Sequence, residues 1–315
     1  MGGFWMTNET RSQTPSNLSI QLVTVLVVGL SFWFVLSQLD SSEIDITETL
    51  SNANSWLLAA FLCIIALTTI SPLLWKVLMY GSGANIPLKT CYGLWWTTNI
   101  AKYIPGKVSL VLGRVWVSRR WGSTVVLESF IWEFLVSVTS AAFAASFLLT
   151  LEGYPVASKA TIGLGCLLSL LPILSPKLTQ QLVRKPLVFF GKGDWNTEIS
   201  MTRKTYILAM ILMTIIWILW GCAHKFILLG VGYDAPFHLL IGAFAVAWFA
   251  GFAAFFLPAG FGAREGVFTY TLSFFLGAGI SALLALLSRT MNILADALLF
   301  FVGLFIYRTE DHEEE

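Results

Sequence analysis

Long apolar runs, separated by short polar segments, make up most of the chain. A helix needs about 20 apolar residues to cross the hydrocarbon core of a bilayer, and several of the runs reach that length. The predicted membrane helices are residues 18–39, 56–80, 125–151, 160–174, 206–230, 239–257, 267–277 and 280–307. This pattern predicts an all-α polytopic integral membrane protein with about seven to eight transmembrane helices.

The composition excludes most soluble classes of protein. Of the 315 residues, 57% are hydrophobic and only 12% are charged, whereas soluble domains average about 25% charged residues. The mean hydropathy of +0.76 agrees. A chain of this size folded in water could not bury so much apolar surface, and a net charge of +1 provides no basic surface for nucleic acid. We therefore exclude a soluble enzyme, a disordered chain and a nucleic-acid-binding protein.

Cysteine and histidine side chains form no metal-binding or disulfide pattern, because they are scattered along the sequence without a CxxC pair. They are Cys63, Cys91, Cys166, Cys222, His224, His238 and His312. We therefore expect neither a metal centre nor another cofactor.

The charges of the loops predict the orientation of the chain, because cytoplasmic loops are enriched in Lys and Arg. Residues 40–54 contain four acidic and no basic side chains, which places this loop outside. Residues 177–204 contain six basic side chains, which places them in the cytoplasm. The span 18–39 is interpreted as an anchor rather than a cleaved signal peptide. Both termini should then be cytoplasmic, in a multi-pass protein of the cytoplasmic (inner) membrane.

Two segments, residues 95–107 and 255–266, interrupt the apolar pattern in the same way. In each, an apolar stretch precedes a Pro, and a Gly follows the Pro within two residues. A further Gly and an Arg come after these. Pro and Gly break helices, and broken backbone survives in lipid only where it is buried or lines a cavity. The predicted helix breaks are Pro105, Gly106, Pro258, Gly260 and Gly262.

The flanks of the two breaks also correspond, since a long span precedes and follows each. The single membrane domain, residues 1–315, therefore divides into candidate repeat units at residues 54–151 and 205–307, joined by a cytoplasmic connector at residues 175–204. According to the loop charges, the first unit begins on the outer side of the membrane and the second begins on the cytoplasmic side. That is the pattern of an inverted repeat, which places a binding site between the two breaks. Chance coincidence of two Pro-Gly loops explains the same pattern, and both interpretations stay open.

Specific motifs accompany the two breaks. They are KYIPG at 102–106 with GR at 113–114, and LPAGFGAREG at 257–266 with SR at 288–289. These motifs resemble the lysylphosphatidylglycerol synthase transmembrane region, also called the flippase-like domain family, over nearly the whole chain. The resemblance implies a lipid-translocating membrane domain and, with no aminoacyl-transferase or glycosyltransferase domain, no enzymatic activity. Phe134 follows Glu133 where the family leads us to expect a basic residue, so the role of Glu133 stays open.

Ionisable side chains inside the apolar segments are candidates for function, because each is unfavourable by roughly 2.5–3.5 kcal/mol at the centre of a membrane helix. The candidate substrate-binding residues are Lys102, Lys107, Arg114, Arg264, Glu265, Arg289 and Asp296. Glu128 and Glu133 are candidates for proton coupling, and their spacing directs them to different sides of a helix. Arg289, Asn292 and Asp296 share one helix face. Arg289 and Asp296 either bind a lipid phosphate or form a structural ion pair.

The residues after the second break have separate expected roles. If a half-helix begins after Gly262, Glu265 lies in its first turn, accepts amide donors and fixes the bend, favoured by the helix dipole. Arg264 points about 100° away from its neighbour, so we expect it not to neutralise Glu265. It either contacts a lipid phosphate through its fork-shaped guanidinium or extends to an aqueous surface.

The cations around the two helix breaks suit a phosphate. The leading hypothesis is a flippase that moves an anionic phospholipid or a polyprenyl-phosphate-linked lipid across the bilayer. The alternative is a non-transporting membrane partner of a glycosyltransferase or lipid synthase, with the basic connector as its docking surface. We do not predict an enzyme, because the sequence shows no nucleophile–base constellation or nucleotide-binding motif. The oligomeric state stays open.

Cysteine labelling tests the orientation in a variant whose four native cysteines have been replaced. A cysteine at Glu48 should react with a membrane-impermeant reagent outside the cell, whereas one at Lys192 should react only after the cell is opened, because acidic and basic loops segregate. Labelling of both positions on one side would remove the basis for inverted units, which need an odd number of crossings between them.

Overall fold

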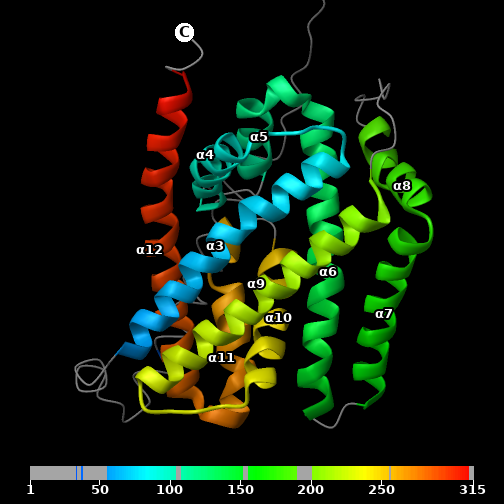
Figure 1. Cartoon of the computed structure of the whole chain (residues 1–315). Helices are drawn as coiled ribbons and strands as arrows, with labels where there is room; N and C mark the ends of the chain where they lie inside the picture. The colour runs from blue at the N-terminus through cyan, green and yellow to red at the C-terminus, as the bar shows by residue number, and fades with distance from the viewer. Residues whose placement is uncertain are drawn as a thin grey trace, which may run out of the picture.

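The chain folds into a bundle of helices (Figure 1). The computed structural model describes residues 33, 37, 55–103, 108–151, 155–189, 201–254 and 257–311, and every regular element among them is a helix. The elements are α3 (Ser55–Gly81), α4 (Leu88–Asn99), η1 (Ile100–Tyr103), α5 (Val108–Val117), η2 (Arg119–Trp121), α6 (Ser123–Leu151), α7 (Pro155–Leu174), α8 (Pro176–Phe189), α9 (Arg203–Gly230), α10 (Phe237–Ala253), η3 (Pro258–Gly260), α11 (Ala263–Leu276) and α12 (Ala278–Asp311). The predicted span 18–39 lies outside the described residues apart from Trp33 and Ser37.

Four helices in the described part of the chain, α3, α6, α9 and α12, are long and apolar enough to cross a membrane. A fifth span results if α7 and α8, which are bent by 109° at a break, count as one broken span. The prediction of an all-α polytopic membrane protein is confirmed. The spans predicted at 239–257 and 267–277 are α10, with 17 residues, and α11, with 14 residues, so each is shorter than the ~20 residues that crossing requires.

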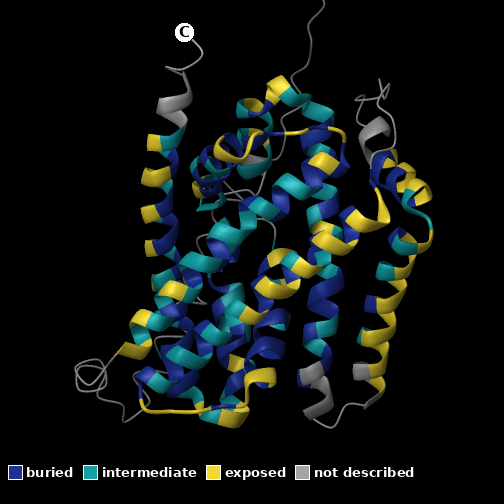
Figure 2. Ribbon diagram, in the orientation of Figure 1, coloured by how far each residue is buried: buried dark blue, intermediate teal, exposed yellow. Residues whose placement is uncertain are grey.

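Many large apolar residues are exposed on the outside of the bundle, and others are buried in its interior. Figure 2 shows how buried and exposed positions are distributed over the helices. On α12, Leu294, Leu298 and Phe301 are exposed and recur at helical spacing along one face. The charged Arg289 and Asp296 lie on another face of the same helix and are buried. This distribution, apolar outside and ionisable inside, is the one that a lipid environment requires.

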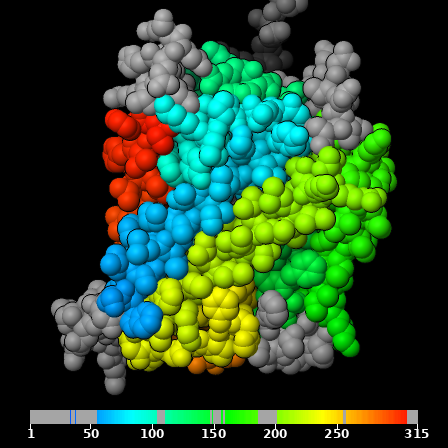
Figure 3. Space-filling view, viewed as in Figure 1, coloured from blue at the N-terminus to red at the C-terminus, as the bar shows by residue number. Residues whose placement is uncertain are grey.

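Helices α3 and α9 lie side by side across the bundle and run in opposite directions (Figures 1 and 3). Gly81 at the end of α3 lies against Met201, just before α9 begins, and a Cβ at Gly81 would collide with the Met201 side chain. Gly230 at the end of α9 lies against Leu57 near the start of α3, where a Cβ would lie 2.8 Å from Leu57 Cδ2. Glycine therefore lets the two helices approach closely at both ends.

The two predicted repeat units, 54–151 and 205–307, have opposite orientations in the bundle (Figure 1). The short helices α4 and α5 lie near the end of α3, whereas α10 and α11 lie at the other end of the bundle, near the end of α9. The long helices that close the units, α6 and α12, also run in opposite directions. Inverted units would have this arrangement, and we retain the repeat as a proposal.

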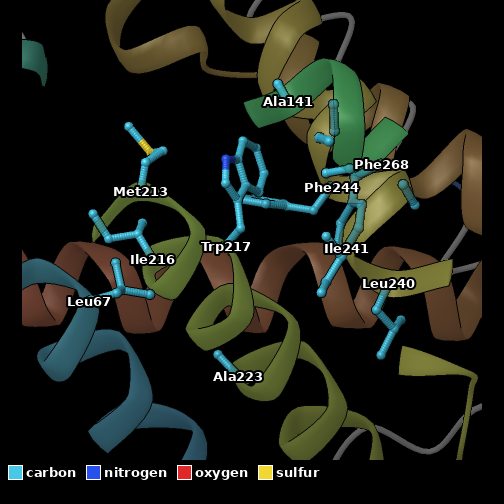
Figure 4. Packing of buried hydrophobic residues seen from close by; sticks show 14 of the residues in the cluster. Leu67, Ala141, Met213, Ile216, Trp217, Ala223, Leu240, Ile241, Phe244 and Phe268 are labelled. Atoms are coloured by element: carbon cyan, nitrogen blue, oxygen red, sulfur yellow. The ribbon is translucent and has the colours of Figure 1, made fainter. Parts of the chain in front are cut away.

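The largest apolar cluster includes the region where α9, α10 and α11 meet (Figure 4). The ring of Trp217 on α9 lies 6.0 Å from the ring of Phe244 on α10, measured between centroids. The Trp217 indole N–H donates to Ser140 Oγ of α6 at 2.8 Å. Phe268 of α11 completes the group, with its ring 5.6 Å from that of Phe244. The tryptophan is stable in this apolar interior because its single polar group has a partner.

The second predicted break forms the turn η3 between α10 and α11. Ala259, Gly260 and Gly262 have φ angles of 46°, 68° and 83°, in the left-handed region that favours glycine. A Cβ on Gly260 would also lie 2.8 Å from the Cα and the carbonyl oxygen of Gly251 on α10. Pro258, Gly260 and Gly262 thus all lie at this turn, and Gly260 is required both by its backbone angle and by its close neighbour.

We expect Gly260→Ala to lower the free energy of unfolding by roughly 1–3 kcal/mol, because it combines backbone strain with a backbone collision. Gly266→Ala is the matched control, since Gly266 lies inside α11 and nothing lies within 4 Å of its Cβ position. Alanine there should be neutral or stabilising by about 0.5–1 kcal/mol. Thermal unfolding in detergent, followed by tryptophan fluorescence, measures both. Equal stability of the two variants would contradict the close contact between Gly251 and Gly260.

Candidate functional site

A cavity of about 390 Å³ lies inside the bundle, between the two broken segments. Four of the predicted substrate-binding residues line it, and so does one of the two residues predicted to couple protons: Lys102, Arg264, Arg289, Asp296 and Glu133. The aromatic part of the lining is Trp95, Phe130, Phe134, Trp220, Phe244, Trp248 and Phe252. A mostly apolar wall with a few converging polar groups is typical of a ligand site.

Asp296 of α12 holds the first broken segment. Its carboxylate accepts hydrogen bonds from Asn99 Nδ2 at 2.9 Å and from the Tyr103 hydroxyl at 2.6 Å. It also forms an ion pair with Lys102 Nζ at 2.6 Å. Asn99 ends α4, and Lys102 and Tyr103 belong to η1. Three donors from one short segment thus converge on a buried carboxylate, which stabilises its charge away from water.

Glu265 holds the second broken segment. Its Oε2 accepts a hydrogen bond at 2.8 Å from the backbone N–H of Gly262, which caps the N-terminus of α11. Its Oε1 lies 3.3 Å from Arg264 Nε and 3.4 Å from Arg289 Nη1. One buried carboxylate therefore joins the bend, α11 and α12, and Glu265 receives the amide donor expected of a residue that fixes the bend.

The structure overturns one prediction about a charged pair and excludes one of two alternatives for another. The prediction that Arg264 and Glu265 point apart is wrong, since they form an ion pair. Glu265 folds back towards Gly262, and the long Arg264 side chain reaches it there. Arg289 and Asp296 share a helix face but do not pair with each other, because Arg289 faces Glu265 and Asp296 faces Lys102.

Arg289 has more hydrogen-bond donors than partners. The residue is 4% exposed, its Nη1 lies 3.4 Å from the carbonyl oxygen of Ala259, and its guanidinium carbon lies 4.0 Å from the centre of the Phe261 ring. Its Nε and Nη2 are buried and have no hydrogen-bond partner within the described structure. Each such donor is unfavourable by about 1–3 kcal/mol, so a hydrogen-bond acceptor on a ligand would stabilise this guanidinium.

The charges around Arg264 and Arg289 leave one cation in excess, among the side chains that the structure describes there. Lys102 is matched by Asp296, but the two arginines share the single carboxylate of Glu265. The Arg264 guanidinium carbon also lies 5.4 Å from the centre of the Phe244 ring, within the range of a cation–π contact. This part of the cavity therefore favours a negative ligand.

Arg114 lies behind the cavity wall rather than in it. Its guanidinium carbon lies 5.0 Å from the ring centres of Trp75 and Phe130 and 5.4 Å from that of Trp95. Its Nη1 lies 3.7 Å from Oε2 of Glu133, which does line the cavity. Arg114 is thus placed to position Glu133 rather than to contact a ligand itself.

Glu128 lies outside the cavity and joins α6 to α8. It is fully buried and accepts hydrogen bonds from Gln180 Nε2 at 2.6 Å and from Arg184 Nε at 2.9 Å. Glu128 and Glu133 do point to different sides of α6. Three further residues predicted for the site lie outside the described residues: Pro105, Gly106 and Lys107.

Sequence reasoning missed Asn99 and Tyr103 as partners of Asp296. They lie three residues before and one residue after Lys102, so helical spacing places the three residues near one face of the segment. That spacing is the signal that identifies them. No pattern in the sequence identifies Trp220 and Phe244 as residues that line the cavity, because aromatic residues occur throughout the chain.

Fold and cavity together define a polytopic membrane domain with a cation-rich internal site. The family described as Lysylphosphatidylglycerol synthase TM region matches residues 21–299, which is most of the chain. The protein belongs to this family of lipid-related, flippase-like membrane domains, and the resemblance seen in the motifs is confirmed. A comparison with curated proteins finds no match.

We expect Asp296→Ala to destabilise the folded protein by roughly 2–4 kcal/mol, because Lys102 loses its counter-ion and the donors of Asn99 and Tyr103 lose their acceptor. Asp234→Ala is the matched control, since it removes the acidic partner of Lys225 at an exposed site and should leave stability nearly unchanged. The unfolding midpoint and the yield of monodisperse protein measure both. Wild-type stability of Asp296→Ala would show that the first broken segment has another anchor.

Proposed function

We propose that this protein translocates lipids with an anionic head group across the membrane, and that the head group binds in the cavity between the two helix breaks. The lipid class is a phospholipid or a polyprenyl-phosphate-linked lipid. Membership of a lipid-related, flippase-like family supports this proposal. A cavity with charged residues inside a bundle of membrane-spanning helices supports it further.

The arginine pair is the observation that carries the proposal. Arg264 and Arg289 both line the cavity and share one carboxylate, and Arg289 retains two buried donors without partners. A phosphate supplies both the acceptors and the negative charge that these groups lack, and guanidinium groups bind phosphate in a bidentate geometry. A neutral, apolar ligand would leave the donors unmatched.

The acidic residues have different proposed roles. Glu133 lines the cavity, and its buried Oε2 has no hydrogen-bond partner within the described structure, so it is the better candidate for proton coupling. Glu128 has two strong donors and lies outside the cavity, so we assign it a role in holding α8 against α6. We infer that the protein binds and moves its lipid without a chemical step on it.

A membrane partner of a glycosyltransferase or lipid synthase is the second candidate. Helix α8 favours it, because Lys177, Leu178, Leu182 and Lys185 form an exposed surface on the connector. Such a surface suits another protein. A docking role does not require the cation-rich cavity, however, and we therefore rank translocation first.

Reconstitution into proteoliposomes tests the proposal. The wild-type protein should accelerate the movement of a tail-labelled fluorescent phosphatidylglycerol between leaflets, measured by chemical quenching of the outer leaflet. Arg264→Lys and Arg289→Lys should fold but lose translocation by roughly tenfold or more, because lysine keeps the charge and loses the bidentate fork. Arg119→Lys is the matched control, since Arg119 is exposed and does not line the cavity.

Two outcomes would contradict this assignment. Full activity of Arg264→Lys would exclude a bidentate contact between Arg264 and the phosphate. Failure of the correctly inserted wild-type protein to move any of several anionic lipids would reject translocation and favour the role as a partner subunit.

A further inference from the structure

Two phenylalanines lie where the cavity reaches the surface between α6 and α10. Phe134 of α6 and Phe252 of α10 both line the cavity, and they are 42% and 37% exposed. Their rings are stacked, with centroids 4.7 Å apart and an angle of 23° between the planes. Each ring therefore borders both the interior of the cavity and the outer surface of the bundle.

Helices α6 and α10 approach each other closely further along their length. A Cβ at Gly242 of α10 would lie 2.9 Å from the backbone nitrogen of Leu148 and 3.1 Å from the carbonyl oxygen of Ala144. Phe252 lies ten residues from Gly242, and Phe134 lies ten residues from Ala144, which is about 15 Å along each helix axis. The backbones thus approach closely at the level of Gly242, and at the level of the cavity two stacked aromatic rings lie between the helices.

An aromatic face of α10 leads from these rings to the arginine pair. Phe244, Trp248 and Phe252 recur at intervals of four residues and all line the cavity. The Trp248 and Phe252 rings are stacked with centroids 5.6 Å apart, and the Arg264 guanidinium lies over Phe244. Gly251, next to Phe252, also packs on Arg264, where a Cβ would lie 3.0 Å from the Arg264 Cβ. The apolar path and the cationic site are therefore continuous.

We propose that the opening between α6 and α10 is a lateral portal for the hydrocarbon chains of the lipid, with Phe134 and Phe252 as its gate. This inference rests on the proposed function and deepens it, because it assigns the route by which the lipid enters. The phosphate binds at Arg264 and Arg289, the chains lie along the aromatic face of α10, and they pass between the two phenylalanine rings into the bilayer.

The chemistry of an anionic lipid favours such a portal. Its chains are most stable in hydrocarbon, whereas its charged head group is unfavourable there, so the two parts need adjoining environments of opposite character. The side chains of Phe134 and Phe252 have no polar atoms. Separation of their rings therefore leaves no hydrogen bond unmade, and a hydrocarbon chain restores the lost apolar contacts.

Photo-crosslinking of the full-length protein tests the portal. Phe252→p-benzoylphenylalanine is reconstituted into phosphatidylcholine vesicles with a phosphatidic acid that carries a fluorescent label on one chain. Labelling should saturate as the phosphatidic acid concentration rises. It should fall about tenfold when Arg264→Gln is added, as expected for loss of a charge-assisted hydrogen bond. In the single variant, with Arg264 unchanged, an excess of unlabelled short-chain phosphatidic acid should also reduce the labelling about tenfold. This competition tests the site even if the double variant folds poorly.

Phe301 of α12 is the matched control, because it is a lipid-exposed phenylalanine, 67% exposed, that does not line the cavity. p-Benzoylphenylalanine at this position should be labelled in linear proportion to the probe and without dependence on Arg264 or on the competitor. The same linear, independent labelling at position 252 would overturn the portal, since it reports contact with bulk lipid only.

The translocation measurement separates the portal from the proposed function. Saturable labelling at position 252 that depends on Arg264, in a protein that moves no lipid, would support the portal as the entrance to a lipid-binding site and reject translocation. Active translocation with linear labelling at position 252 would reject the portal alone.

Discussion

Backbone that leaves the helical conformation inside a membrane must find its polar partners within the protein, and this constraint organises the whole bundle. One helix, α12, contacts both broken segments, through side chains at the first and through a backbone carbonyl and a side chain at the second. Asp296 gathers the donors of the segment that ends α4, and Arg289, seven residues earlier, contacts the Ala259 carbonyl and Glu265 in the second segment. The two breaks therefore meet beside one face of α12, and the cavity lies between them.

The groups that stabilise the breaks also give the cavity its charge. Glu265 caps α11 with one oxygen and faces Arg264 and Arg289 with the other. Because two guanidinium groups share one carboxylate, the arrangement that fixes the bend leaves donors on Arg289 unpaired. Structural support and ligand binding thus depend on the same carboxylate, so a change at Glu265 affects both.

Local features of the sequence, namely the length of apolar runs, Pro and Gly positions and charges within apolar segments, determine the class of protein and most of the candidate site. Apolar runs predict membrane helices because their length matches the bilayer, and Pro258 with Gly260 and Gly262 predicts the turn that the structure places at η3. The energetic penalty of a charge in lipid singles out Arg264, Arg289 and the other ionisable residues without any knowledge of the fold. Helical spacing also places Arg289 and Asp296 on one face, where both are buried.

Only the tertiary structure decided which charge faces which. Asp296 pairs with Lys102, which lies 194 residues earlier in the sequence, rather than with Arg289. Glu133 enters the cavity wall while Glu128, on the same helix, is held by α8. The partner of a buried charge depends on which helices meet and at what level along their axes. Close contacts of small residues with distant parts of the chain contribute to that level, as at Gly242 against α6. Spacing of small residues can indicate a close helix contact, but it does not say which helix is contacted or at what level.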